Sequence, residues 1–152
     1  MTLDATDKRI LSVLQKRGRI SNADLSEVVN LSPSACHRRV QRLESDGYIR
    51  DYVALLDPRR MGVASIVYVE ITLRGQTDDI LDAFEKAVAR IPNVQECHLM
   101  AGTADYILKV VAENTEDFAR IHRQHLSRLP GVTQMQSSFA LRTVISTTAL
   151  PV

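Results

Sequence analysis

Three consecutive segments in the first sixty residues repeat apolar positions with the period of an α-helix. The first is residues 5–17, which Asp4 or Thr6 can cap and which Gly18 is expected to stop. The second is a short helix that begins after Ser21, where an acidic residue three positions on completes a capping-box pattern. The residues of this second helix that are predicted to face inward are Leu25, Val28 and Val29.

The third helix has the clearest start and end signals of the three. Ser32 is predicted to cap it, Pro33 takes the first helical position, and Gly47 ends it. An i, i+4, i+7 set forms its buried stripe: Cys36, Val40 and Leu43. The opposite side is polar and cationic, and the side chains predicted to lie there are Ser34, His37, Arg38, Gln41 and Arg42, with Arg39 at the margin.

A short helix, a tight turn and a basic helix are typical of a helix-turn-helix. Such a unit places its second helix in the major groove of DNA, with the first turns of that helix on base edges. The side chains predicted to face DNA are hydroxyls, one imidazole and guanidiniums: Ser32, Ser34, His37, Arg38, Arg39 and Arg42. Arginine can donate to two acceptors of guanine, whereas serine reads bases more loosely. The alternative is a surface helix whose basic residues are merely solvated.

The segment after Gly47 is rich in aromatic and β-branched residues. Residues 48–55 are predicted to form one or two short strands, ended by Asp57-Pro58. A strand in this place suits a wing or a linker arm. Arg50, Arg59 and Arg60 can either contact phosphates or remain solvated.

The last ninety residues predict strand, helix, strand, strand, helix, strand. The first strand is indicated by alternation along "ASIVYVEITLR", and helices are predicted after Thr77 and Thr115 as caps. The sequence "RIPNV" at 90–94 recurs as "RLPGV" at 128–132. Two similar βαβ halves in tandem predict a ferredoxin-like βαββαβ fold, an antiparallel sheet with helices on one face.

Both faces of this sheet carry apolar residues, although an uncovered face is usually polar. In the first strand, Ile66 and Tyr68 lie on one side while Val67 and Val69 lie on the other. We therefore expect a second subunit to cover the face without helices, giving at least a homodimer. A dimer also suits DNA binding, because two reading helices can meet half-sites about one helical turn apart.

The segment "MAGTADYIL", residues 100–108, joins the second and third strands of this unit. Gly102 permits a positive φ, and Asp105 suits turn chemistry. The residues alone therefore predict a hairpin turn, and turn formation is one complete explanation of the carboxylate.

Charge is distributed unevenly over the 152 residues, although the net charge is only +1. Residues 1–62 hold 11 Lys and Arg against 8 Asp and Glu, whereas residues 63–152 hold 8 against 10. The basic first part suits a polyanionic partner. No signal-peptide pattern and no apolar run long enough for a membrane span are seen. Cys36 and Cys97 predict no disulfide framework, and together these features favour a cytoplasmic protein.

Candidate chemistry of other kinds is sparse. His122 and His125 lie at i, i+3 on a predicted helix and could begin a metal site, but no ligands stand at matching spacing. No nucleophile motif, phosphate loop or carboxylate pair stands out. We expect neither an enzyme nor a bound cofactor, and no metal site.

Several stretches resemble the Lrp/AsnC family of transcriptional regulators, also called feast/famine regulators. The stretches are "DKRILSVLQKRGRISNADLSEVVNLS", "SACHRRVQRLESDGYIRDYVALLDP", "QECHLMAGTADYILKV" and "LPGVTQMQSSFAL". The resemblance covers nearly the whole chain and keeps both parts in order. One departure is Ser34-Ala35, where many members have Thr-Pro, and this departure puts the base preference in doubt.

The resemblance implies an α+β protein with an N-terminal winged helix-turn-helix and a C-terminal ferredoxin-like αβ-sandwich. It also implies dimers that pair through their sheets and assemble into octamers, with amino-acid effectors bound in clefts between dimers. In this family a Gly-x-x-Asp hairpin lines that cleft. The corresponding positions here are Gly102 and Asp105, with Met100, Ala101 and Thr103 beside them.

The residues and the resemblance together predict a DNA-binding domain at 1–62, including a linker strand, and an effector-binding and oligomerisation domain at 63–152. The predicted function is a sequence-specific regulator of transcription that binds double-stranded DNA and responds to a small effector, most naturally an amino acid. Two alternatives stay open. One is a metabolite-binding oligomer without specific DNA readout, and the other is a metal-responsive regulator.

Overall fold

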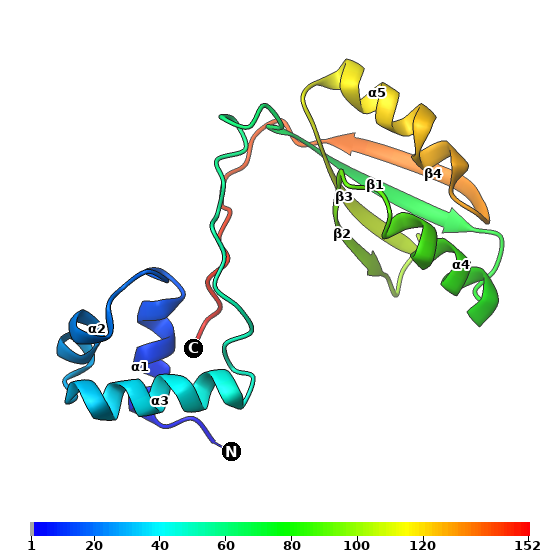
Figure 1. Cartoon of the computed structure of the whole chain (residues 1–152). Helices are drawn as coiled ribbons and strands as arrows, with labels where there is room; N and C mark the ends of the chain where they lie inside the picture. Colours follow the sequence, from blue (N-terminus) through cyan, green and yellow to red (C-terminus); the bar gives the residue numbers. More distant parts are fainter. Residues whose placement is uncertain (1) are drawn as a thin grey trace. The chain divides into compact units, whose positions relative to one another are not determined.

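The computed structural model describes residues 2–152, which form two compact units (Figure 1). The first unit contains the chain up to Leu55 together with the C-terminal segment Ile145–Val152, and the second contains Leu56–Val144. The C-terminal segment is attached through Gln15, whose Nε2 donates to the carbonyl of Leu150 and whose Oε1 accepts from its amide, both at 2.8 Å. No periodicity in the sequence predicts this return of the chain.

The first unit is built from the three predicted helices, α1 (Ala5–Leu14), α2 (Asn22–Val29) and α3 (Pro33–Ser45). Each helix begins as predicted at an N-cap side chain that accepts a backbone N–H, and these caps are Asp4, Ser21 and Ser32. All three helices contribute to one apolar core, whose buried members are Ile10, Leu14, Leu25, Val29, Cys36 and Leu43.

Two details of these helices differ from the prediction. Helix α1 ends at Leu14 rather than at 17, and Gly18 does not adopt the left-handed conformation that would stop it. Val28 was expected to face inward but is 49% exposed. The face of α2 that packs on the other helices carries Leu25, Ser26 and Val29, each 2% exposed, and Val28 lies outside this face.

The strands predicted after Gly47 do not form. Residues 50–57 are extended without regular pairing, and within residues 2–55 of the first unit the structure has helices only. Val53 and Leu55 are 73% and 70% exposed. Strand propensity alone cannot form a wing, because a strand needs a neighbour to accept its hydrogen bonds.

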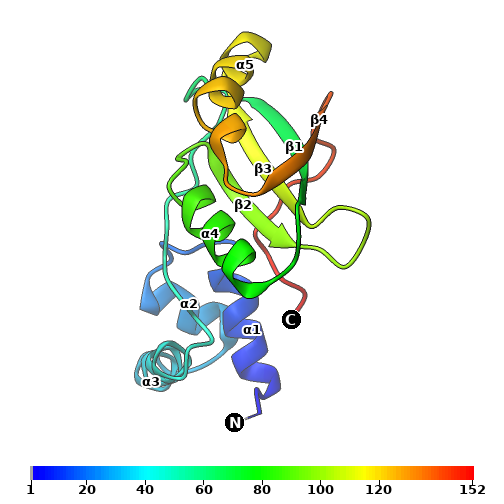
Figure 2. The same ribbon diagram turned by 90° about the vertical axis from the view of Figure 1, so that its right-hand side faces the viewer.

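The second unit has the predicted βαββαβ order (Figure 2). Its elements are β1 (Ser65–Leu73), α4 (Asp78–Val88), β2 (Val94–Leu99), β3 (Tyr106–Ala112), α5 (Thr115–Gln124), a short 3-10 turn (Leu126–Arg128) and β4 (Val132–Phe139). The strand order is β2-β3-β1-β4, and every neighbouring pair is antiparallel. The ferredoxin-like prediction is confirmed.

One face of this sheet and both helices enclose the core of the second unit. Val67, Val69 and Ile71 of β1 are fully buried, as are Phe84 of α4 and Ile121 of α5. The alternation of buried and outward residues in β1 is the pattern that its sequence predicts.

The opposite face of the sheet mixes apolar and charged side chains. Tyr68 is 42% exposed there, and its neighbour across the β1–β3 ladder is Lys109. Glu96 of β2 lies 3.5 Å from the Lys109 ammonium and 3.1 Å from the His98 ring. The other apolar residues of this face are half-buried in the single chain: Ile66, Ile107 and Val111.

The cap of α5 is Asn114 and not Thr115, which is the first helical residue. Asn114 accepts the backbone N–H of Asp117 at 2.9 Å through its side-chain oxygen. Replacing Asn114 with alanine is therefore expected to lower the free energy of unfolding by about 1 kcal/mol. Thermal melts of the full chain measure this as a shift of a few degrees. The matched control Thr115→Ala should change stability by less than half as much, and equal shifts for the two variants would contradict this cap assignment.

Candidate DNA interface and effector site

The outward face of α3 carries most of the predicted DNA-reading residues. Ser34, His37 and Arg38 are exposed, and so is Gln41 one turn further on. Among residues 2–152 the Arg38 guanidinium has no hydrogen-bond or ion-pair partner. At the start of the helix, Ser32 accepts the backbone N–H of Ala35 at 3.2 Å and lies 3.4 Å from the Ser34 hydroxyl. A free guanidinium beside hydroxyls and an imidazole can donate to base edges or to phosphates.

The other two predicted arginines point elsewhere. Arg39 Nη1 contacts Asp4 Oδ2 at 2.7 Å and Asp7 Oδ1 at 2.8 Å, and Arg42 Nη2 contacts Asp7 Oδ2 at 2.7 Å. Both carboxylates belong to the start of α1, and that of Asp7 is only 2% exposed. The residues predicted to face DNA therefore fall into two groups. Arg39 and Arg42 contact α1. The others face outward: Ser32, Ser34, His37 and Arg38.

The Asp4 carboxylate is strongly stabilised in its charged form. The backbone N–H of Asp7 and the Arg39 guanidinium both donate to it and lower its pKa to about 2. Because folding lowers the pKa of Asp4, its carboxylate stabilises the fold at pH values above the ordinary pKa of an aspartate. This stabilisation is lost as the pH falls toward 2. The acidic first turn of α1 was the sequence signal for this contact, although the partner helix could not be identified from it.

The predicted effector hairpin connects β2 to β3. Met100, Ala101, Gly102 and Thr103 are exposed, and the backbone N–H of Met100 closes the hairpin on the Asp105 carbonyl at 2.8 Å. Gly102 permits a positive φ but does not adopt one, and a Cβ added there would meet nothing within 4 Å. The conformation of the hairpin therefore does not require glycine at this position.

The carboxylate of Asp105 joins the hairpin to the end of β1. Its Oδ2 accepts the backbone N–H of Leu73 at 2.7 Å, and its Oδ1 accepts the side-chain amide of Gln76 at 3.0 Å. Its own N–H donates to the Ile71 carbonyl at 2.9 Å. Both oxygens of the Asp105 carboxylate therefore accept hydrogen bonds within the chain.

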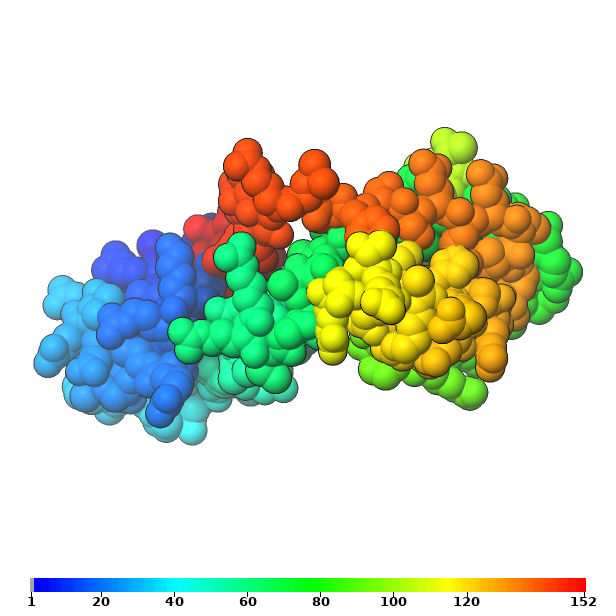
Figure 3. Space-filling view, turned by 90° about the horizontal axis from the view of Figure 1, so that it is seen from above, coloured from blue at the N-terminus to red at the C-terminus, as the bar shows by residue number. Residues whose placement is uncertain are grey.

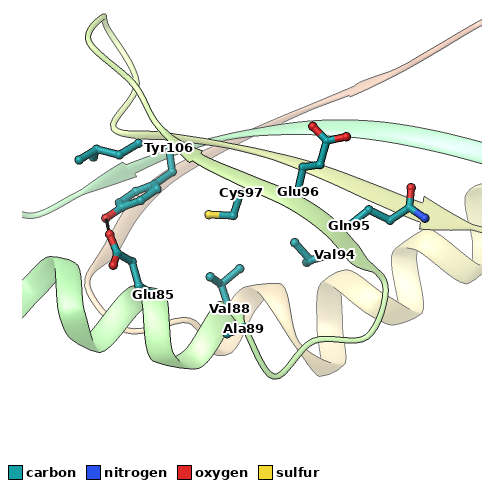
Figure 4. A pocket seen from close by; sticks show the side chains of 9 residues that line it. Glu85, Val88, Ala89, Val94, Gln95, Glu96, Cys97 and Tyr106 are labelled. Atoms are coloured by element: carbon teal, nitrogen blue, oxygen red, sulfur yellow. Dashed lines mark hydrogen bonds between the residues drawn. The ribbon is translucent and has the colours of Figure 1, made fainter. Parts of the chain in front are cut away.

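A hollow of about 460 Å³ lies between α4 and the edge strand β2, beside the hairpin (Figure 4). At its floor the Tyr106 hydroxyl donates to Glu85 at 2.6 Å. Burial and this hydrogen bond raise the pKa of Tyr106. Leu99 and Tyr106, which line the hollow, flank the hairpin in sequence. The remaining lining residues are Val88, Ala89, Val94, Gln95, Glu96 and Cys97.

The lining of this hollow favours binding over covalent chemistry. Burial raises the pKa of the Cys97 thiol to about 11, so the thiol is protonated and a poor nucleophile at neutral pH. Glu85 of α4 gives the hollow its acidic character, whereas the carboxylate of Glu96 points to the opposite face of the sheet and pairs there with Lys109 and His98. An acidic, partly apolar hollow can hold an ammonium group that carries an apolar side chain. The sequence did not reveal this hollow, because it arises from the packing of α4 against β2.

Within residues 2–152 no group of three or more His, Cys, Asp or Glu side chains is placed to hold a metal ion. His122 and His125 therefore have no third ligand among these residues. None of the helices there has the length and the apolar composition to cross a membrane.

Sequence comparison assigns a known model to each unit. Residues 3–50 match a winged helix-turn-helix DNA-binding model, and residues 66–150 match the Lrp/AsnC ligand binding domain. The first match contains α1, α2 and α3. The second contains the sheet except for Ser65, the first residue of β1, and it includes the hairpin and the hollow.

Whole-chain relatives agree with these matches. The leucine-responsive regulatory proteins of Klebsiella pneumoniae and Escherichia coli are each 42% identical over 93% of this chain and 87% of their own length. A transcriptional regulator from Neisseria meningitidis, solved as a complex with L-methionine, has a TM-score of 0.94 and 38% identity. It covers 99% of this chain and 97% of its own. An AsnC family regulator from Agrobacterium tumefaciens has the same TM-score with 34% identity, covering 98% and 97%.

Proposed function

Because this chain belongs to the Lrp/AsnC family of transcriptional regulators, we propose that it reads a specific DNA sequence with α3 and that an amino acid controls this binding. The observation that carries the proposal is the outward face of α3. Arg38 is exposed and unpaired within the described residues, and Ser34 and His37 stand beside it. A reading helix needs free donors of this kind in its first turns.

The amino-acid effector is supported by the second unit and by its relatives. Relatives of this chain are named for leucine or bind L-methionine. The hairpin Met100–Asp105 offers exposed backbone groups to a carboxylate, and Glu85 in the adjoining hollow offers a carboxylate to an ammonium. The apolar residues that line the hollow then select the side chain of the bound amino acid. In this proposal Met100, Ala101, Gly102 and Thr103 line the effector, and Asp105 holds the hairpin in place.

The proposed working form is a homodimer that assembles further into an octamer in the cytoplasm. Support for the dimer comes from the face of the sheet that no helix covers, where Ile66, Tyr68, Ile107 and Val111 remain partly exposed in one chain. A partner would bury this surface and bring two α3 helices to one DNA duplex. The octamer is proposed because members of the Lrp/AsnC family commonly assemble into octamers.

The DNA-binding part is tested with the duplex upstream of the chain's own coding sequence and a random duplex of equal length. We expect tighter, salt-sensitive binding to the upstream duplex in gel shifts. Equal binding to both would favour the alternative of a metabolite-binding oligomer without specific readout.

The effector part is tested by a thermal-shift screen of the twenty amino acids, with L-leucine and L-methionine as the first probes. A ligand at 100 times its dissociation constant should add about 2.7 kcal/mol to the stability of the unit that binds it. The same screen with zinc, iron and nickel separates the metal-responsive alternative. No shift with any amino acid would refute the proposed effector class.

A further inference from the structure

Asp7 is a buried carboxylate at the start of α1, and its charged partners come from the helix that is proposed to enter DNA. It accepts one guanidinium N–H from Arg39 at 2.8 Å and one from Arg42 at 2.7 Å. A buried carboxylate without such partners is strongly unfavourable, because it loses its hydration. The first unit therefore folds with both arginines turned toward α1. The Arg42 Nε is itself buried, and it has no acceptor among residues 2–152.

The cluster formed by Asp4, Asp7, Arg39 and Arg42 is electrically neutral, since two carboxylates face two guanidiniums. Helix α3 contains three arginines, and the third is the exposed Arg38. The start of α1 thus balances two of the three arginine charges of the reading helix. The same contacts fix the rotation of α3 about its axis, so that Arg38 faces solvent.

We propose, on the basis of the DNA-binding function above, that Asp7 is a positioning residue that sets DNA specificity. It keeps Arg39 and Arg42 away from phosphates and holds α3 with Arg38 outward. Each phosphate contact made by arginine adds sequence-independent affinity, and it adds about 0.9 to the slope of log affinity against log salt concentration. A reading helix with three free arginines would bind any duplex more tightly. The neutral cluster therefore limits nonspecific binding while it leaves base reading intact.

Asp7→Asn tests this role, because it keeps the shape of the side chain and removes its charge. For the full chain we expect about tenfold tighter binding to a random duplex, with a salt slope steeper by about 1 to 2. The ratio of specific to nonspecific affinity should fall. Fluorescence anisotropy at several salt concentrations measures all three quantities. Glu27→Gln is the matched control, since it makes the same charge change at an exposed position of α2 and should leave the slope unchanged.

A second variant keeps the test decisive if Asp7→Asn fails to fold. Arg42→Gln leaves Asp7 paired with Arg39, and circular dichroism verifies its helices. Its salt slope should equal that of the unchanged protein, whereas Arg38→Gln should lower the slope by about 1. An equal loss for the two variants would place Arg42 on a phosphate and overturn the role of Asp7.

The same measurements distinguish failure of the proposed DNA reading from failure of the role of Asp7. If the unchanged protein shows no sequence preference, the proposed DNA reading fails. If it shows one and Asp7→Asn keeps the same ratio and slope, only the role of Asp7 fails.

Discussion

Alanine at position 38 is expected to weaken binding to the preferred duplex by about 1–3 kcal/mol, or roughly tenfold to hundredfold. Arg38 is the one arginine of α3 that has no partner among residues 2–152, and it is exposed in the middle of the outward face. Removing it deletes donors that no neighbouring side chain can replace. The stability of the Arg38→Ala variant should hardly differ from that of the unchanged protein, because an exposed side chain without partners contributes little to folding.

The control for this variant is Arg9→Ala, which removes the same charge from an exposed position of α1. Binding of both variants to the preferred duplex and to a random one separates base reading from general attraction. If Arg38 reads a base, the ratio of specific to nonspecific affinity falls for Arg38→Ala alone. If it contacts only phosphate, both affinities fall together and the salt slope drops by about 1. No loss beyond that of the Arg9 control would exclude α3 as the reading helix in this orientation.

Elements defined by neighbouring residues were predictable from the sequence. Ser21 and Ser32 were correctly read as caps, because a cap accepts an N–H only three residues away. The alternation of β1 also predicted its buried face. The short strands predicted after Gly47 and the inward Val28 were wrong for a shared reason. Both depend on which other segment lies opposite, and local periodicity carries no information about that segment.

The contacts that define the candidate site join residues that are distant in sequence. Arg42 reaches Asp7 across 35 positions in the sequence. The charge of Arg42 suggested a DNA contact, and only the packing of α3 on α1 revealed its intramolecular partner. Asp105 was predicted either to shape a turn or to bind the effector, and the residue that its carboxylate contacts, Leu73, lies 32 positions away in the sequence. That contact follows from the pairing of β1 with β3, which becomes known only with the strand order.

Asp105→Ala is expected to remove most of the effector response and to lower the free energy of unfolding of the second unit by about 1–3 kcal/mol. The stability loss arises because the backbone N–H of Leu73, a residue that is 4% exposed, loses the acceptor it has at 2.7 Å. The effector response is lost because the hairpin is no longer tied to the end of β1. DNA affinity without effector should change little, since the first unit contains none of these contacts.

Asp105→Asn distinguishes shaping of the hairpin from direct contact with the ligand. The asparagine oxygen can still accept from Leu73, and the Gln76 amide can rotate to accept from the new NH₂ group. If Asp105 shapes the hairpin, this variant should keep at least half of the thermal shift that the amino acid found in the screen produces. If Asp105 binds the ammonium of the ligand directly, Asp105→Asn should lose the shift as fully as Asp105→Ala does, because a charge-assisted hydrogen bond is lost in both. We expect the first result, since both carboxylate oxygens already accept hydrogen bonds from β1 and the loop that follows it.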